Sequence, residues 1–118
     1  MQFNAMFRHG LVLGFILALT GCSIYTMPGS ERAPIDTSAA AGLLGKARTA
    51  SAQGDYEQAL ALLERAQRID PNSAEIYLQL ARVYAAQGQL DKSRDTASRG
   101  TLYCRDEREC SALRALAR

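Results

Sequence analysis

The sequence predicts an all-α protein of two helical hairpins and a C-terminal capping helix, preceded by a signal peptide and a disordered tether. Two observations carry this prediction. The segment 47–54 (Ala-Arg-Thr-Ala-Ser-Ala-Gln-Gly) recurs at 81–88 (Ala-Arg-Val-Tyr-Ala-Ala-Gln-Gly), an offset of 34 residues. A fixed period of this size is typical of chains in which each repeat buries its apolar face against a neighbour. In both repeats, apolar residues also recur at intervals of three and four, as on one buried face of a helix.

The first hairpin is bounded by a glycine turn and a proline. Gly54 lies where a left-handed residue commonly ends a helix. Asp55 can then cap the second helix, with Gln58 as its capping-box partner. Pro71 ends the hairpin, because the residue before a proline is pushed out of helical geometry. The two expected buried faces consist of Ala40, Leu43, Leu44, Ala47 and Ala50, and of Tyr56, Ala59, Leu60, Leu63 and Ala66.

The second hairpin repeats this plan, with Asn72 as the cap, Glu75 as its box partner and Gly88 at the turn. Its expected buried residues are Ile76, Tyr77, Leu80, Ala81 and Tyr84, followed by Leu90, Ser93, Ala97 and Gly100.

A fifth helix is expected after Tyr103, with Asp106 as its cap and Glu109 as the box partner. Terminal repeats need an element that covers their open apolar face. The apolar residues of this helix are suited to that role: Cys110, Leu113, Leu116 and Ala117.

The spacing of these residues resembles the tetratricopeptide repeat over roughly residues 39–105. That family's pattern is a large residue, a small one, an aromatic, a glycine, an aromatic, two small residues and a proline. The first copy fills these places with Leu43, Ala47, Ala50, Gly54, Tyr56, Ala59, Ala66 and Pro71. The second copy fills them with Tyr77, Ala81, Tyr84, Gly88, Leu90, Ser93, Gly100 and Arg105. The departures are Ala50 in an aromatic place and Arg105 in place of the closing proline.

The N-terminus predicts export. Arg8 and His9 precede a short apolar run at 11–19, which ends in Leu-Thr-Gly-Cys at 19–22. The run is shorter than the roughly 20 residues that span a bilayer, and its composition is typical of a secretory signal. The ending resembles a bacterial lipobox, which implies cleavage after residue 21 and acylation of Cys22 with fatty acids such as palmitate. The alternative is an ordinary signal peptide with an incidental cysteine.

Residues 22–37 are expected to be a flexible tether between the lipid and a helical domain at 38–118. The tether contains Pro28, Gly29, Ser30 and Pro34 and few apolar residues. Ser23 follows the cysteine, where an aspartate would favour the inner membrane in enterobacteria-like sorting. We therefore predict a lipid anchor at the periplasmic face of the outer membrane.

Cys104 and Cys110 are the cysteines that remain once Cys22 is acylated. In an exported protein such a pair indicates a disulfide. Two free buried thiols are an alternative. A further alternative is metal ligation or redox chemistry. Two thiols without a histidine are too few ligands for a structural zinc site. Their spacing also differs from the Cys-x-x-Cys motif of redox enzymes.

Composition argues against catalysis and nucleic-acid binding. The only histidine, His9, leaves with the signal peptide, which removes the commonest general base and metal ligand. Phosphate-loop and nucleophile motifs are missing from the sequence, and the net charge of +2 gives no basic footprint. We expect no catalytic residue, no metal site, no cofactor and no nucleic-acid partner.

The resemblance implies a concave groove, lined by the first helix of each hairpin, that binds extended or helical peptides. The matching positions are Leu44, Arg48, Ser51, Glu75, Leu78, Arg82 and Ala85. Two arginines on one groove can hold a carboxylate bidentately. The alternative is that both arginines are solvated helix residues and that both leucines pack against neighbouring helices.

These features predict a non-enzymatic adaptor that binds a protein or peptide partner in the periplasm. The resemblance points to cell-wall biogenesis, in which small outer-membrane lipoproteins with such repeats activate bifunctional peptidoglycan synthases. A pilotin-like assembly factor for a pilus or secretin is an alternative. Another is a structural homo-oligomer without a client, since two repeats are fewer than the three or so usually needed for independent stability.

Overall fold

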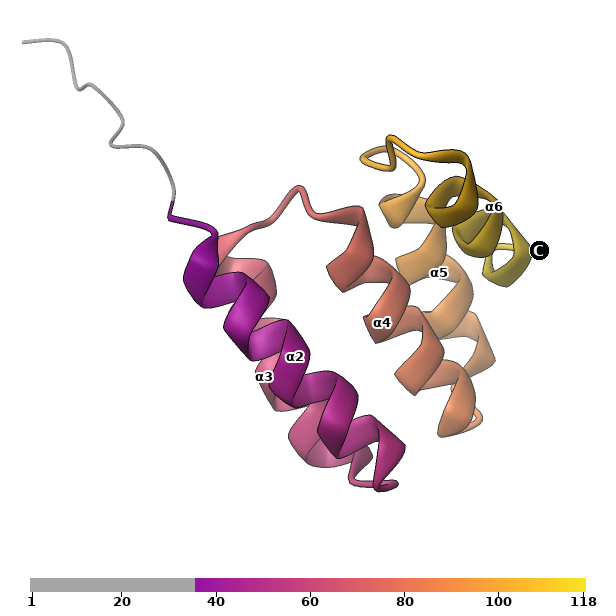
Figure 1. Cartoon of the computed structure of the whole chain (residues 1–118). Coiled ribbons are helices and arrows are strands. Elements are labelled where there is room, and N and C mark those ends of the chain that lie inside the picture. Colours follow the sequence, from indigo (N-terminus) through magenta and orange to yellow (C-terminus); the bar gives the residue numbers. More distant parts are fainter. Residues whose placement is uncertain (1–35) are drawn as a thin grey trace, which may run out of the picture. The chain divides into compact units, whose positions relative to one another are not determined.

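The computed structural model describes residues 36–118. The predicted signal peptide, the acylation site Cys22 and the tether up to residue 35 lie outside the described residues. The described chain forms five helices, α2 (Ser38–Ala52), α3 (Tyr56–Ile69), α4 (Ala74–Ala86), α5 (Leu90–Gly100) and α6 (Glu107–Leu116). Helices α2 and α3 pair as one hairpin, α4 and α5 as a second, and α6 packs against the second hairpin (Figure 1). The predicted all-α architecture is confirmed.

The two hairpin turns follow the glycine pattern of the sequence. Gly54 and Gly88 adopt φ values of +78° and +75°, a left-handed conformation that favours glycine over residues with a Cβ. Immediately after the first turn, an Asp55 carboxylate oxygen accepts a hydrogen bond from the Gln58 N–H at 3.1 Å, as predicted for a cap. The local signals in the sequence thus set where α2 and α4 end.

The cap of α6 is confirmed and that of α4 is wrong. Asp106 accepts a hydrogen bond from the Glu109 N–H at 2.9 Å. The N-cap of α4 is Ser73, whose side chain makes no cap hydrogen bond, rather than Asn72. Pro71 and Asn72 occupy the turn between the hairpins, so α4 begins one residue later than the pattern suggested.

A first core cluster joins α2, α3 and α4. Alanines dominate it, and Leu63 and Ile76 are its largest fully buried side chains, each 1% exposed. Small residues let neighbouring helices approach closely, and tight packing then supplies the stabilising contacts. The buried members are Ala40, Ala47, Ala50, Ala59, Leu63, Ala66, Ile76, Leu80 and Val83.

A second core cluster holds α6 against the second hairpin. It contains Ala74, Leu78, Ala81, Ala97 and Leu113. Beside it, the buried Ser93 hydroxyl donates to the Ala81 carbonyl at 2.8 Å, which ties α5 to α4. Leu90 does not contribute, because it is the first residue of α5 and is 56% exposed.

The connection between α5 and α6 is fixed by two contacts. Cys104 and Cys110 form the predicted disulfide, with their Cα atoms 5.3 Å apart. The Tyr103 ring stacks on Tyr77 of α4, with ring centroids 5.5 Å apart. A cross-link over so short a loop stabilises the folded state by about 2 kcal/mol, through the entropy lost by the unfolded chain.

Two glycines inside α2 predict a gain of stability on substitution. A Cβ at Gly42 or Gly45 would meet no atom within 4 Å, and glycine in a helix interior costs about 0.5–1 kcal/mol relative to alanine. The double variant Gly42→Ala/Gly45→Ala should raise the free energy of unfolding by about 1–2 kcal/mol, measured by urea denaturation. As a matched control, Gly54→Ala should lower it, because the residue has a positive φ. A loss of stability in the double variant would contradict an open face at this position.

Candidate protein-binding groove

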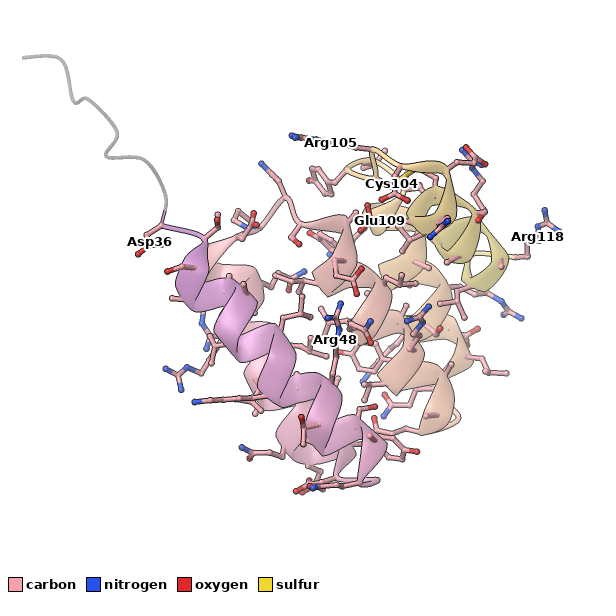
Figure 2. The ribbon with its side chains drawn as sticks, viewed as in Figure 1. Asp36, Arg48, Cys104, Arg105, Glu109 and Arg118 are labelled. Carbon is pink, nitrogen blue, oxygen red and sulfur yellow. A yellow bond between two sulfur atoms is a disulfide. The ribbon has the colours of Figure 1, made fainter. Side chains whose placement is uncertain are left out.

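An ion pair joins the first helices of the two hairpins. The Arg48 Nη2 atom on α2 donates to the Glu75 Oε1 atom on α4, 27 residues away in sequence. The same oxygen accepts a hydrogen bond from Gln79 Nε2 at 2.8 Å. Figure 2 shows Arg48 at the face where α2 and α4 lie next to each other. The structure thus brings together two of the seven residues predicted for the groove.

This pair leaves Arg48 able to change partners. The side chains of Arg48 and Glu75 are 51% and 32% exposed, and ion pairs this accessible to water contribute roughly 0–1 kcal/mol. A carboxylate on a partner can therefore compete for the guanidinium at little cost. Arg82 is exposed on the same helix as Glu75, and within residues 36–118 it takes part in none of the ion pairs.

Leu44, one helical turn before Arg48 on α2, lines a small hollow. The hollow has a volume of 170 Å³ and lies between the start of α2, the connection before α4, and α4 itself. Leu44 is half-buried and also packs against the first core cluster. The other lining residues are mostly small or apolar: Thr37, Ala40, Ala41, Asp70, Ser73 and Ile76. The space suits one aliphatic side chain of a partner.

Leu78 does not line an accessible groove. It is 4% exposed and belongs to the cluster that holds α6 against the second hairpin. The groove prediction is wrong for this position, and the alternative applies: Leu78 packs against a neighbouring helix, beside Leu113 of α6. Ser51 and Ala85 are half-buried near the C-terminal ends of α2 and α4.

Two further residues extend the polar face. Gln79 shares the carboxylate of Glu75. Burial raises the pKa of Glu109, and the negative charges of Asp106 and then Glu75 raise it further. Because the charge of Glu75 raises the pKa of Glu109, the two carboxyl groups lie near each other. The polar face that contains Arg48, Glu75 and Gln79 therefore extends onto α6. The sequence analysis predicted Glu109 only as a capping partner of Asp106, and its proximity to Glu75 depends on how α6 packs against α4.

Within the part of the chain that the structure describes, no group of three or more His, Cys, Asp or Glu residues is placed to hold a metal ion. None of the helices between residues 36 and 118 combines the length and apolarity needed to cross a membrane.

Comparisons with known proteins agree with this architecture. A sequence model described as tetratricopeptide repeat matches residues 50–117, more than half of the chain. Among solved structures, the chain is similar to the globular C-terminal domain of LpoP from P. aeruginosa, at 32% sequence identity and a TM-score of 0.64. That match covers 68% of this chain and 76% of the LpoP chain. No curated protein sequence matches the chain. The chain therefore belongs to the tetratricopeptide-repeat family.

Proposed function

We propose that the protein is a non-enzymatic, LpoP-like outer-membrane lipoprotein that binds and activates a bifunctional peptidoglycan synthase. The observation that carries this proposal is the similarity to the LpoP globular domain, at 32% identity over 76% of that chain. It agrees with the expectation from the repeat pattern, in which small lipoproteins of this kind activate such synthases. The chemistry is the synthase's own, and this protein supplies a docking surface.

The lipobox-like ending at Cys22 supports the anchor that this function requires. Several acyl chains, each contributing about 0.8 kcal/mol per buried CH₂, hold a protein stably on a membrane. The 15 residues from Ser23 to Thr37 span at most about 50 Å when fully extended. The helical domain would therefore stay near the outer membrane, and a synthase anchored in the inner membrane would have to reach toward it.

The face formed by α2 and α4 supplies the chemistry for docking. Arg82 is exposed, Arg48 is held only by a solvent-accessible pair, and Leu44 opens onto a hollow of 170 Å³. A partner segment with a carboxylate beside an aliphatic side chain fits this arrangement, because guanidinium groups bind carboxylates through paired hydrogen bonds.

The test measures binding and activation together. The mature lipidated protein is mixed with the bifunctional synthase of the same organism, and affinity and the rate of glycan polymerisation are recorded. Arg48→Ala/Arg82→Ala should weaken binding by about 10- to 100-fold, as loss of two interface arginines commonly does. Arg65→Ala/Arg108→Ala is the matched control, since it removes the same charge from exposed positions on α3 and α6.

Each outcome has a distinct meaning. A wild-type protein that leaves the polymerisation rate unchanged would overturn the proposed function. Unchanged affinity of the Arg48/Arg82 variant, with its thermal unfolding intact, would overturn the docking face alone. Binding to a secretin or pilus subunit in place of the synthase would favour the pilotin-like alternative. A stable self-associated particle without a client, seen by light scattering, would favour the structural homo-oligomer.

A further inference from the structure

A second and larger hollow lies on the other side of α4. It has a volume of 330 Å³ and is lined by residues of α3, α4 and α5: Glu64, Gln67, Arg68, Tyr77, Leu80, Tyr84, Thr96 and Arg99. Successive helical residues are rotated by about 100°, so Tyr77 and Tyr84 lie roughly 160° around α4 from Glu75 and Arg82. This hollow is therefore separate from the candidate docking face formed by α2 and α4.

The lining is rich in hydrogen-bond donors and poor in negative charge. Arg68 and Arg99 bring guanidinium groups, Tyr77 and Tyr84 bring phenol groups, and Glu64 is the only carboxylate among the lining residues. Neither arginine takes part in an ion pair within residues 36–118. Such a lining is complementary to an anion that accepts hydrogen bonds.

Helix ends explain only part of this arrangement. Arg68 and Arg99 lie in the last turns of α3 and α5, where a positive charge is favoured by the helix dipole. That effect accounts for an arginine at each helix end. The helix dipole does not explain why both arginines line the same hollow. Nor does it explain why α4 places the phenol groups of Tyr77 and Tyr84 in that lining.

Contacts outside the hollow fix the positions of its two aromatic lining residues, Tyr77 and Tyr84. Tyr77 stacks on Tyr103 at 5.5 Å between ring centroids, and Tyr103 adjoins the Cys104–Cys110 disulfide. The Lys92 ammonium lies 5.7 Å from the centre of the Tyr84 ring and adds a third cation beside the hollow. Burial raises the pKa of Tyr84, and the charge of Glu64 raises it further, so this phenol stays a hydrogen-bond donor at neutral pH. A wall ordered in advance loses less entropy when a ligand binds.

We propose that this hollow is a second docking site, which receives a carboxylate side chain from an acidic segment of the protein partner. The proposal rests on the proposed function and extends it to the opposite face of α4. Arg68 and Arg99 hold the carboxylate, and the Tyr84 hydroxyl donates to it. The volume is at the low end of small-molecule sites, and Leu80 with the two aromatic rings gives apolar contact to the carbon atoms of that side chain.

The first arm of the test uses the synthase. In the mature lipidated protein, Arg68→Ala/Arg99→Ala should weaken binding to the synthase at least about 10-fold. Arg68→Lys/Arg99→Lys should recover only part of the loss, because lysine keeps the charge without the paired donors. Arg65→Ala/Arg108→Ala should bind like the wild type. Unchanged affinity of the Arg68/Arg99 variant, while the Arg48/Arg82 variant is weakened, would overturn this inference and leave the proposed function standing.

The second arm does not need the synthase. An acetylated and amidated triglutamate peptide is titrated into the isotope-labelled mature protein in detergent, and NMR spectra are recorded. We expect millimolar binding that shifts the Arg68, Arg99 and Tyr84 side-chain resonances and disappears in the Arg68→Ala/Arg99→Ala variant. If these resonances shift although the synthase does not bind, the site stands and the proposed function fails.

Two further results would contradict the proposal, one from the triglutamate titration and one from a parallel titration with purified peptidoglycan stem peptides. Absence of any shift would overturn it. If the Arg68/Arg99 variant loses binding to purified peptidoglycan stem peptides but keeps its affinity for the synthase, the occupant is the cell wall and the assignment to a protein segment is wrong.

Discussion

Replacing Leu113 by alanine should lower the free energy of unfolding by about 2–5 kcal/mol, the range for truncating a fully buried leucine. Leu113 is 0% exposed and is the member of the second core cluster that α6 contributes. Its loss removes apolar contacts and leaves a cavity among Leu78, Ala81 and Ala97. A domain of this size has a small core and is stabilised only marginally, so the variant should be close to unfolding at physiological temperature.

Urea denaturation with the disulfide intact measures this loss directly. Thermal unfolding should move down by about 4–8 °C for each kcal/mol lost. Leu116→Ala is the matched control, because Leu116 is on the same helix but only half-buried, and it should cost less. A cost below about 1 kcal/mol for Leu113→Ala would mean that α6 does not seal the second hairpin.

Replacing Gly100 by alanine should destabilise the protein, although the same change normally favours a helix. A Cβ at this position would lie 2.7 Å from Leu113 Cδ2 and 2.8 Å from Tyr77 Cβ. The leucine tip can rotate away, but Tyr77 Cβ is attached to the backbone of α4, so α4 and α5 must separate. Overpacking of this kind costs about 1–3 kcal/mol, which exceeds the gain of about 1 kcal/mol in helix propensity.

A double-mutant cycle tests the cause of this loss. Leu113→Ala removes one of the two clashing groups, so Gly100→Ala should cost less in the Leu113→Ala background than in the wild type. The open Gly42 and Gly45 positions of α2 serve as the control, since alanine is expected to stabilise the protein there. Equal costs in the two backgrounds would mean that the side chain of Leu113 is not the obstacle.

The features that the sequence predicted correctly are local. Gly54 and Gly88 mark turns by their backbone freedom, and Asp55 and Asp106 cap helices through a donor three residues away. The 34-residue offset added the relation between the two hairpins. The turns and caps depend on a few neighbouring residues, and the relation between the hairpins depends on one sequence offset. Both kinds of signal are visible in the sequence without knowledge of the tertiary contacts.

The features that it missed depend on which helices meet in space. Periodicity placed Leu78 level with Leu44, but Leu78 is buried in the cluster that contains Leu113 of α6, whereas Leu44 is only half-buried. The Arg48–Glu75 pair joins two helices that are separated by a hairpin. The hollow beside Tyr84 needs side chains from three helices, and no spacing in the sequence relates Arg68 to Arg99.

The cross-link between Cys104 and Cys110 also affects when the protein reaches its full stability. It ties two residues only six apart, and such a pair forms in an oxidising compartment and stays reduced in the cytosol. The reduced chain lacks this constraint, and α6 is then held by packing alone. If the protein is exported as proposed, its precursor would cross the membrane in this less stable reduced form. Oxidation after export would then add the cross-link that secures α6.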